Sequence, residues 1–229
     1  MKPKLFVAGC SFSDYSQVDA VYGELLAEKL GYDYQHEGSG CGSNYRIWRV
    51  IGNHIMQGRL NSKDLLIVQY TSMERREFWS HNPANPNEPK KVNLSEPFEL
   101  GGSLLKYKSY STQWQRFKEE KDFLELYENY FCSIEYESQW FIIMHAYFQS
   151  FLLSREIPTV FLETMYMNNI ELENQFAATR LVWMKNLTDT TIQLIPNEDH
   201  GHLNIKGHQL LADDLYQHIT RQHAQEEHK

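Results

Sequence analysis

The start of the chain alternates between the pattern of a buried strand and the pattern of a helix, and this alternation limits the fold more than any other feature. Residues 4–9 (Lys-Leu-Phe-Val-Ala-Gly) form a short apolar run that ends at a glycine, which is typical of a strand buried on both faces. A polar turn follows at 10–18, and a helical repeat then runs to a stop at Gly31. The apolar positions of this repeat are Val21, Leu25, Leu26 and Leu30. A strand, a turn and a helix in this order begin a βαβ unit, which predicts a parallel sheet.

The same two patterns return along the rest of the chain. Strand character is found at residues 32–36, 64–70, 157–162 and 191–195. Helix character is found at residues 45–57, in two pieces within 117–155, and at 208–219. We therefore predict an α/β fold, a three-layer α/β/α sandwich around a mostly parallel central sheet.

Residues from about 80 to 112 interrupt this pattern. Four prolines and several asparagines in and around this stretch argue against regular structure, so we interpret it as an irregular insertion. Such an insertion either covers a ligand site or is an ordinary surface loop. A chain of 229 residues that is 41% hydrophobic has enough apolar material for one substantial core. We expect residues 1–229 to form a single domain.

Composition argues against several classes of partner. The formal net charge is −8, whereas a protein that neutralises many phosphates needs a basic surface, so nucleic acid is not expected as a partner. The three cysteines include no CxxC pair and no zinc-like spacing, so we expect neither a disulfide framework nor a metal site. No apolar run approaches the ~18 residues of a membrane span, and the N-terminus does not resemble a signal peptide. We expect a cytoplasmic protein that does not bind membranes; its oligomeric state is left open.

A serine follows the first predicted strand. In Gly9-Cys10-Ser11-Phe12-Ser13 the glycine ends the strand, which places Ser11 at the carboxyl edge of the sheet, where open α/β sheets bind ligands. Backbone N–H groups that no strand uses are available there to stabilise an oxyanion. The alternative is that Ser11 or Ser13 only caps a turn or a helix.

An acid and a histidine follow the last predicted strand. A serine hydroxyl needs a base to remove its proton, and a histidine does this near neutral pH when a carboxylate fixes its tautomer. Asp199 and His202 are three residues apart on a turn, so both can point into one pocket. We expect His200 to be a solvated neighbour and His208, within the closing helix, to be structural.

Two further segments carry candidate hydrogen-bond donors. The loop at 38–44 has three glycines in five residues, so Gly40 can approach a ligand closely, and Asn44 offers a side-chain amide. Its spacing matches neither a dinucleotide loop nor a phosphate loop, so no cofactor is expected. Gln69, Thr71 and Ser72, at the end of the strongest predicted strand, are further candidates for binding substrate or an oxyanion.

Taken in order, these segments resemble the sequence blocks of the SGNH/GDSL hydrolase superfamily. Residues 9–13 are similar to its first block, with Ser11 as nucleophile, and residues 199–202 to its final Asp-x-x-His block. Gly40 matches the glycine of the second block, whose N–H helps hold the oxyanion. The resemblance implies a flavodoxin-like SGNH hydrolase fold and a Ser11–His202–Asp199 triad that works without metal or cofactor.

The chain departs from this family at two places. Cys10 replaces the usual aspartate beside the nucleophile, but that aspartate is not the acid of the triad. The third block usually ends Gly-x-Asn-Asp and supplies an oxyanion donor, whereas this chain has Gln69-Tyr-Thr-Ser72, so the Thr71 hydroxyl is the expected substitute. Loss of one such donor costs about 10²–10³ in rate in a well-studied hydrolase, so we expect a slow or specialised enzyme.

Three functions agree with these residues. The first is a serine esterase, with an O-acetyl group on a carbohydrate or similar polar compound as substrate. The carbohydrate assignment rests on the resemblance and on the aromatic residues near the insertion, which are Trp79, Tyr107, Tyr110 and Trp114. The second is an acyltransferase that passes the acyl group to a sugar hydroxyl through the same triad. The third is a non-catalytic binding module that retains the fold, which the altered third block favours.

Overall fold

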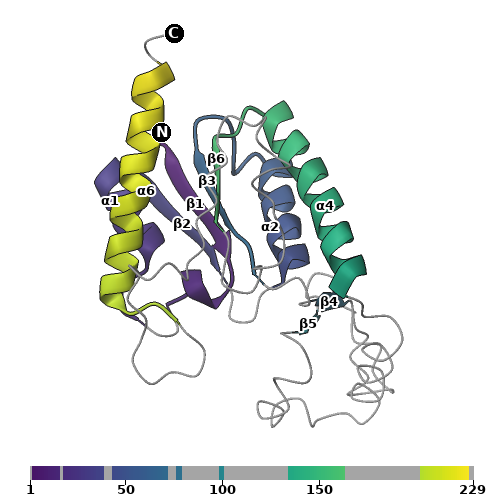
Figure 1. The fold of residues 1–229 in the computed structure, drawn as a ribbon. Helices are drawn as coiled ribbons and strands as arrows, with labels where there is room; N and C mark the ends of the chain where they lie inside the picture. The colour runs from purple at the N-terminus through teal and green to yellow at the C-terminus, as the bar shows by residue number, and fades with distance from the viewer. Residues whose placement is uncertain are drawn as a thin grey trace, which may run out of the picture.

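The central feature of the protein is a four-stranded parallel sheet (Figure 1). The computed structural model describes residues 2–15, 18–38, 43–71, 76–78, 98–100, 134–162 and 202–226. The strands of the sheet are β1 (Lys4–Gly9), β2 (Asp33–Gly38), β3 (Leu65–Gln69) and β6 (Thr159–Leu162). Their spatial order is β2-β1-β3-β6, so β1 lies in the interior of the sheet and its carboxyl end is flanked by strands on both sides.

Helices cover both faces of the sheet and complete three layers (Figure 1). One face carries α1 (Tyr22–Leu30) and α6 (Ile205–Glu226), and the other carries α2 (Asn44–Met56) and α4 (Ile134–Ser154). None of the helices in the described ranges combines the length and the apolar character of a membrane span. The predicted α/β/α sandwich with a parallel sheet is confirmed.

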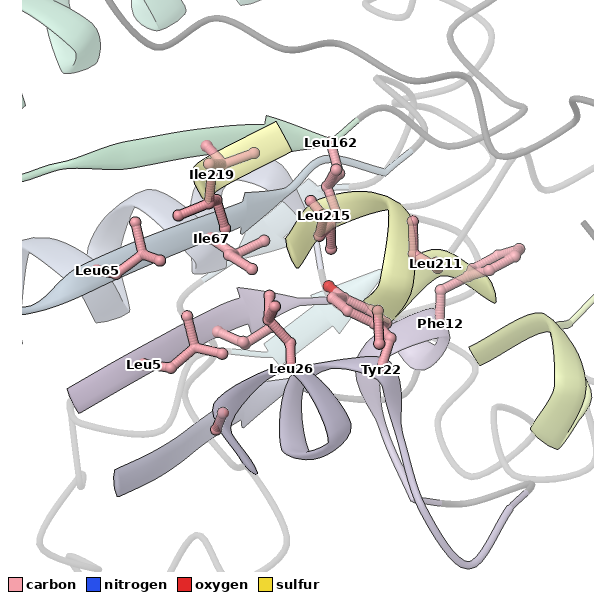
Figure 2. Close-up of a cluster of buried hydrophobic side chains, with 14 of the residues drawn as sticks. Leu5, Phe12, Tyr22, Leu26, Leu65, Ile67, Leu162, Leu211, Leu215 and Ile219 are labelled. Atoms are coloured by element: carbon pink, nitrogen blue, oxygen red, sulfur yellow. The ribbon is translucent and has the colours of Figure 1, made fainter. Parts of the chain in front are cut away.

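Two apolar clusters fill the spaces between the layers, because successive side chains of a strand point to opposite faces of the sheet. Leu5 and Val7 of β1 pack with α1 and α6, and Figure 2 shows this cluster around Tyr22. Phe6 and Ala8 point the other way and pack with α2 and α4. The unbroken apolar run of β1 is therefore explained by burial on both faces.

Most elements begin and end close to the residues that the sequence predicts, and the exceptions have local causes. Helix α6 (Ile205–Glu226) begins before and ends beyond the predicted 208–219. It begins early because the Asn204 side chain accepts a hydrogen bond from the Gly207 N–H at 2.8 Å and so caps the helix. Within the predicted irregular insertion, β5 (Phe98–Leu100) pairs antiparallel with β4 (Arg76–Phe78). The prediction of irregular structure was therefore wrong for residues 98–100. Residues 117–133 of the predicted helical region, the predicted strand at 191–195 and the remainder of the insertion lie outside the described residues.

Gly23 lets α1 lie close to the sheet. A Cβ atom at Gly23 would lie 2.7 Å from the Tyr34 ring and 2.8 Å from Val7 Cγ2, whereas a Cβ at Gly52 in α2 would meet nothing within 4 Å. We expect Gly23→Ala to lower the free energy of unfolding by about 1–3 kcal/mol through overpacking. Its control, Gly52→Ala, is expected to raise it by about 0.5–1 kcal/mol because alanine is the better helix former. Urea unfolding of both variants measures the two effects, and a stabilising Gly23→Ala would contradict this packing.

Candidate active site

Ser11 and His202, which are 191 residues apart in sequence, are in direct contact. Ser11 begins the short 3₁₀ helix η1 (Ser11–Ser13) directly beyond the carboxyl end of β1, and His202 lies shortly before α6. The His202 Nε2 atom is 2.8 Å from the Ser11 Oγ atom. When this nitrogen carries no proton it accepts the serine hydroxyl hydrogen, which is the arrangement that activation by a general base requires. The predicted nucleophile and base are thus brought together.

The turn that presents Ser11 is held by its own hydrogen bonds. Both the backbone N–H and the hydroxyl of Ser13 donate to the Cys10 carbonyl, at 3.0 and 2.9 Å. The Ser13 carbonyl accepts a 2.7 Å hydrogen bond from His36 Nε2, which links the turn to the edge strand β2. Ser13 is fully buried, whereas Ser11 is only partly buried. Ser13 therefore supports the turn, and Ser11 is the serine that a substrate can reach.

A stacking contact fixes the plane of the His202 ring. The rings of Phe12 and His202 stack with centroids 4.9 Å apart and planes 22° apart. The next residue, Leu203, is buried in the cluster between the sheet and α6. Because Phe12 belongs to the same turn as Ser11, the contact ties the orientation of the imidazole to the position of the hydroxyl.

Of the residues predicted to complete the site, Asp199, Gly40 and Ser72 lie outside the described residues. Thr71 is described and fully buried, and its backbone N–H donates to Asn44 Oδ1 at 2.9 Å. Its hydroxyl has no hydrogen-bond partner among the described residues. Among the polar groups of Thr71, the hydroxyl is therefore the one without a partner in the described part of the chain.

The Asn44 side chain, predicted as a donor to a ligand, makes two hydrogen bonds to Thr71. The Asn44 side chain binds both backbone groups of one residue, since its Nδ2 donates to the Thr71 carbonyl at 3.0 Å and its Oδ1 accepts from the Thr71 N–H. This pair of bonds, which we call the Asn44 clasp, joins the first residue of α2 to the chain just beyond β3. An amide that binds both backbone groups of a residue positions that residue, and a contact of Asn44 with a ligand stays a prediction.

Gln69, predicted to contact a substrate or an oxyanion, is bound by other side chains of the protein. Gln69 is fully buried: its Nε2 donates to Cys10 Sγ and its Oε1 accepts from the Tyr22 hydroxyl, both at 3.3 Å. The side chain thus turns inward below the turn that carries Ser11. It contacts the site through other residues and not directly.

A buried polar chain on the α2–α4 face was not predicted. The Trp48 indole N–H donates to the Tyr70 hydroxyl at 3.3 Å, and that hydroxyl lies 2.7 Å from His145 Nδ1. Burial lowers the pKa of His145 to about 4, so the ring is neutral near pH 7, with one nitrogen that donates and one that accepts. The signal for this chain in the sequence is a histidine, His145, that stands among aromatic residues of the helical region within 117–155.

His208 has the structural role expected of it. Its Nδ1 accepts a 3.2 Å hydrogen bond from the Tyr22 N–H in the first turn of α1. The N-cap residue of α1 makes no side-chain hydrogen bond to this turn, so His208 takes over the capping role. Burial, together with the nearby His202, lowers the pKa of His208 to about 4. The neutral ring is the form that can accept this bond.

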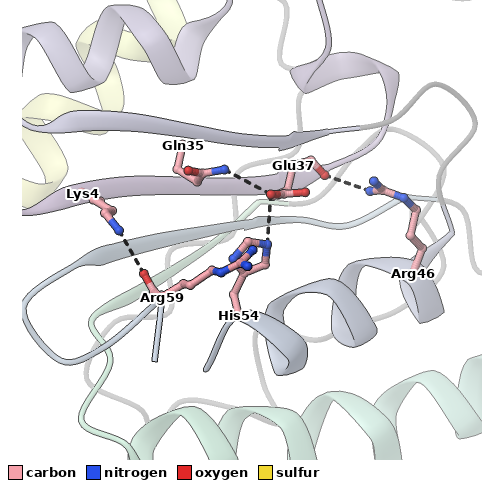
Figure 3. Close-up of polar contacts among 6 residues, drawn as sticks. All are labelled: Lys4, Gln35, Glu37, Arg46, His54 and Arg59. Atoms are coloured by element: carbon pink, nitrogen blue, oxygen red, sulfur yellow. Dashed lines mark hydrogen bonds and ion pairs between the residues drawn. The ribbon is translucent and has the colours of Figure 1, made fainter. Parts of the chain in front are cut away.

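A set of polar contacts brackets the glycine-rich loop (Figure 3). The Glu37 carbonyl at the end of β2 accepts a 2.8 Å hydrogen bond from the Arg46 guanidinium of α2. The Glu37 carboxylate lies 3.0 Å from His54 Nε2 and accepts a 3.1 Å hydrogen bond from Gln35. The two flanks of the loop, β2 and α2, are therefore joined to each other. Within the described ranges there is no cluster of three side chains able to hold a metal ion.

Comparisons with known proteins support the fold. No family model and no curated protein matches the sequence. A solved structure of a protein assigned to the lipolytic G-D-S-L family from Desulfitobacterium hafniense DCB-2 superimposes with a TM-score of 0.51 at 8% identity, covering 94% of this chain and 98% of that one. A member of the same family from Veillonella parvula DSM 2008 gives a TM-score of 0.52 at 9% identity, with 95% and 98% covered. With a parallel sheet of this order and these structural neighbours, the chain has the SGNH/GDSL-type fold.

Proposed function

We propose that the protein is a serine hydrolase acting on ester bonds, with Ser11 as nucleophile and His202 as general base. The observation that carries the proposal is the 2.8 Å contact between the Ser11 hydroxyl and His202 Nε2 at the carboxyl end of a parallel strand. The structural neighbours add support, because both belong to a family described as lipolytic and share this fold.

In the proposed reaction the Ser11 oxygen attacks the ester carbonyl while His202 takes the hydroxyl proton. The tetrahedral intermediate then expels the alcohol, which receives that proton from His202, and an acyl-serine remains. Water, deprotonated by His202, hydrolyses the acyl-serine and returns the free enzyme. We assign the carboxylate that orients His202 to Asp199, three residues before it in the sequence.

Three donors are proposed to hold the negative charge on the carbonyl oxygen. Two are backbone N–H groups, those of Ser11 and Gly40, and the third is the Thr71 hydroxyl. The Thr71 assignment draws on its buried hydroxyl, which has no partner among the described residues, and on the Asn44 clasp, which fixes the backbone of Thr71. Within the ester class, we propose an acetyl ester of a carbohydrate or a similar polar compound as substrate.

The test is covalent labelling with a fluorophosphonate, which reacts with an activated serine. We expect one adduct per chain, and peptide mass spectrometry should place it on Ser11. Ser154, an exposed serine at the end of α4, is the internal control and should remain unmodified. A folded protein that takes up no label would point to a binding module, and an adduct on another residue would remove Ser11 from the proposal. If acyl-enzyme forms, product analysis with and without an added sugar separates hydrolysis from acyl transfer.

A further inference from the structure

A chain of buried hydrogen bonds runs beneath the site and connects four elements of the fold. Gln69 at the end of β3 donates to Cys10 Sγ at the end of β1, and the Tyr22 hydroxyl of α1 donates to Gln69 Oε1. The Tyr22 N–H in turn donates to His208 Nδ1 of α6. All four residues are buried, with exposed fractions between 0% and 3%. Figure 2 shows Tyr22 between the sheet and the two helices.

Both ends of this chain lie next to the catalytic pair. Cys10 directly precedes Ser11, and the backbone N–H of His208 donates to the carbonyl of Asn204, two residues after His202. The contact between His202 and Ser11 joins the two ends of the chain to each other. The nucleophile turn and the start of α6 are therefore held together from below as well as at the site itself.

The position of Gln69 is hard to explain by packing alone. The four residues before it in β3 are Leu, Leu, Ile and Val, and an apolar side chain would continue this buried strand without any polar group to satisfy. Room for the glutamine depends on Gly9, because a Cβ atom there would lie 2.9 Å from both Cβ and Oε1 of Gln69. Burial raises the pKa of Tyr22 well above its ordinary value, so its hydroxyl keeps its proton and donates to Gln69.

We propose that Gln69 and Tyr22 are positioning residues, which set the distance between the Ser11 hydroxyl and His202 through Cys10 and His208. This inference rests on the proposed hydrolase function, to which it adds residues that never touch the substrate. A networked set of buried polar groups fixes one arrangement of the elements it joins, whereas apolar packing tolerates small shifts.

The experiment compares Gln69→Met and Tyr22→Phe with Thr159→Val. Each variant removes a buried hydrogen-bonding group with little change of volume, but the Thr159 hydroxyl donates to the Ile157 carbonyl at the amino end of β6, whereas Ser11 lies beyond the carboxyl end of β1. We expect both site variants to lower the fluorophosphonate labelling rate and kcat about 10-fold with KM unchanged, since a displaced nucleophile weakens the reacting geometry more than binding. Thr159→Val should lose similar thermal stability and keep the wild-type rates.

A double variant and a measurement without catalysis keep the inference separate from the proposed function. Gln69→Met with Tyr22→Phe should be no slower than Gln69→Met alone, because the two residues act through one chain.

Nuclear magnetic resonance of the His202 ring should show a shift on Ser11→Ala that is lost in the Gln69→Met background. If that shift persists, or if Gln69→Met labels at the wild-type rate, positioning by Gln69 is overturned. If wild-type protein fails to label, the ring resonance alone decides the inference. Should Gln69→Met fail to fold, Tyr22→Phe, which lacks one oxygen atom, decides in its place.

Discussion

Ser11→Ala and His202→Ala are each expected to lower kcat/KM for ester hydrolysis by at least about 10³-fold, and the double variant by no more than either single one. Residues that act as one unit give strongly non-additive effects, because removal of either member already abolishes the activated nucleophile. The 2.8 Å contact between the two side chains is the physical basis for treating them as a unit. Kinetics with a short-chain chromogenic ester measure all three variants.

The matched controls are Ser154→Ala and His218→Ala, which change the same residue types at positions outside the candidate site. Ser154 ends α4 and is exposed, and His218 lies in α6, well beyond its first turn. Both controls should keep wild-type kinetics. Losses that multiply in the double variant would show that Ser11 and His202 work independently, and the assignment of His202 as the base of Ser11 would fail.

Acid is expected to destabilise the protein strongly between pH 6.5 and pH 4. Burial lowers the pKa of both His145 and His208 from 6.5 to about 4, so the unfolded chain binds protons in this interval that the folded chain does not. A group whose pKa is depressed by folding stabilises the fold above its unfolded pKa and loses that contribution as the pH falls towards the folded value. Each histidine should cost on the order of 3 kcal/mol across the interval, a large part of the stability of a typical domain.

Urea unfolding at a series of pH values measures this loss, and His145→Leu identifies its source. The variant leaves the Tyr70 hydroxyl without its histidine partner, which lowers stability at every pH, but it should remove the contribution of His145 to the slope of stability against pH. Tyr70→Phe is the control, because it breaks the same hydrogen bond and leaves the histidine in place. A slope in His145→Leu equal to that of the wild type would mean that His145 does not titrate as its burial implies.

The fold was predictable because burial patterns determine it. The apolar run of β1 and its glycine stop predicted a strand buried on both faces, and the clusters on its two sides are what such a strand requires. Helix α6 began early because of one capping side chain, Asn204, whose effect depends on local geometry. The Ser11–His202 pair was predictable because Ser11 directly follows the carboxyl end of a parallel strand and His202 belongs to an acid-and-histidine segment just before the closing helix.

The directions of polar side chains near that edge were not predictable. Polar residues near the carboxyl edge of such a sheet often bind ligands, and this rule led to the predictions for Gln69 and Asn44. In the structure both side chains form hydrogen bonds to other residues of the protein. Gln69 turns inward because Gly9, sixty residues earlier in the sequence, leaves space for it. Such a space depends on how distant segments pack, and no local pattern in the sequence reveals it. The acid assigned to Asp199 remains a prediction.

The Asn44 clasp has a consequence for how the activity can change over time. The clasp binds the backbone of Thr71 and does not involve its side chain. Threonine can therefore be exchanged for valine or serine while both hydrogen bonds of the clasp persist. At Thr71 the atoms that support the fold are therefore different from the atom proposed to take part in catalysis. Under the proposed function, natural variation or directed evolution can change the oxyanion donor at this position without rebuilding the strand that precedes it.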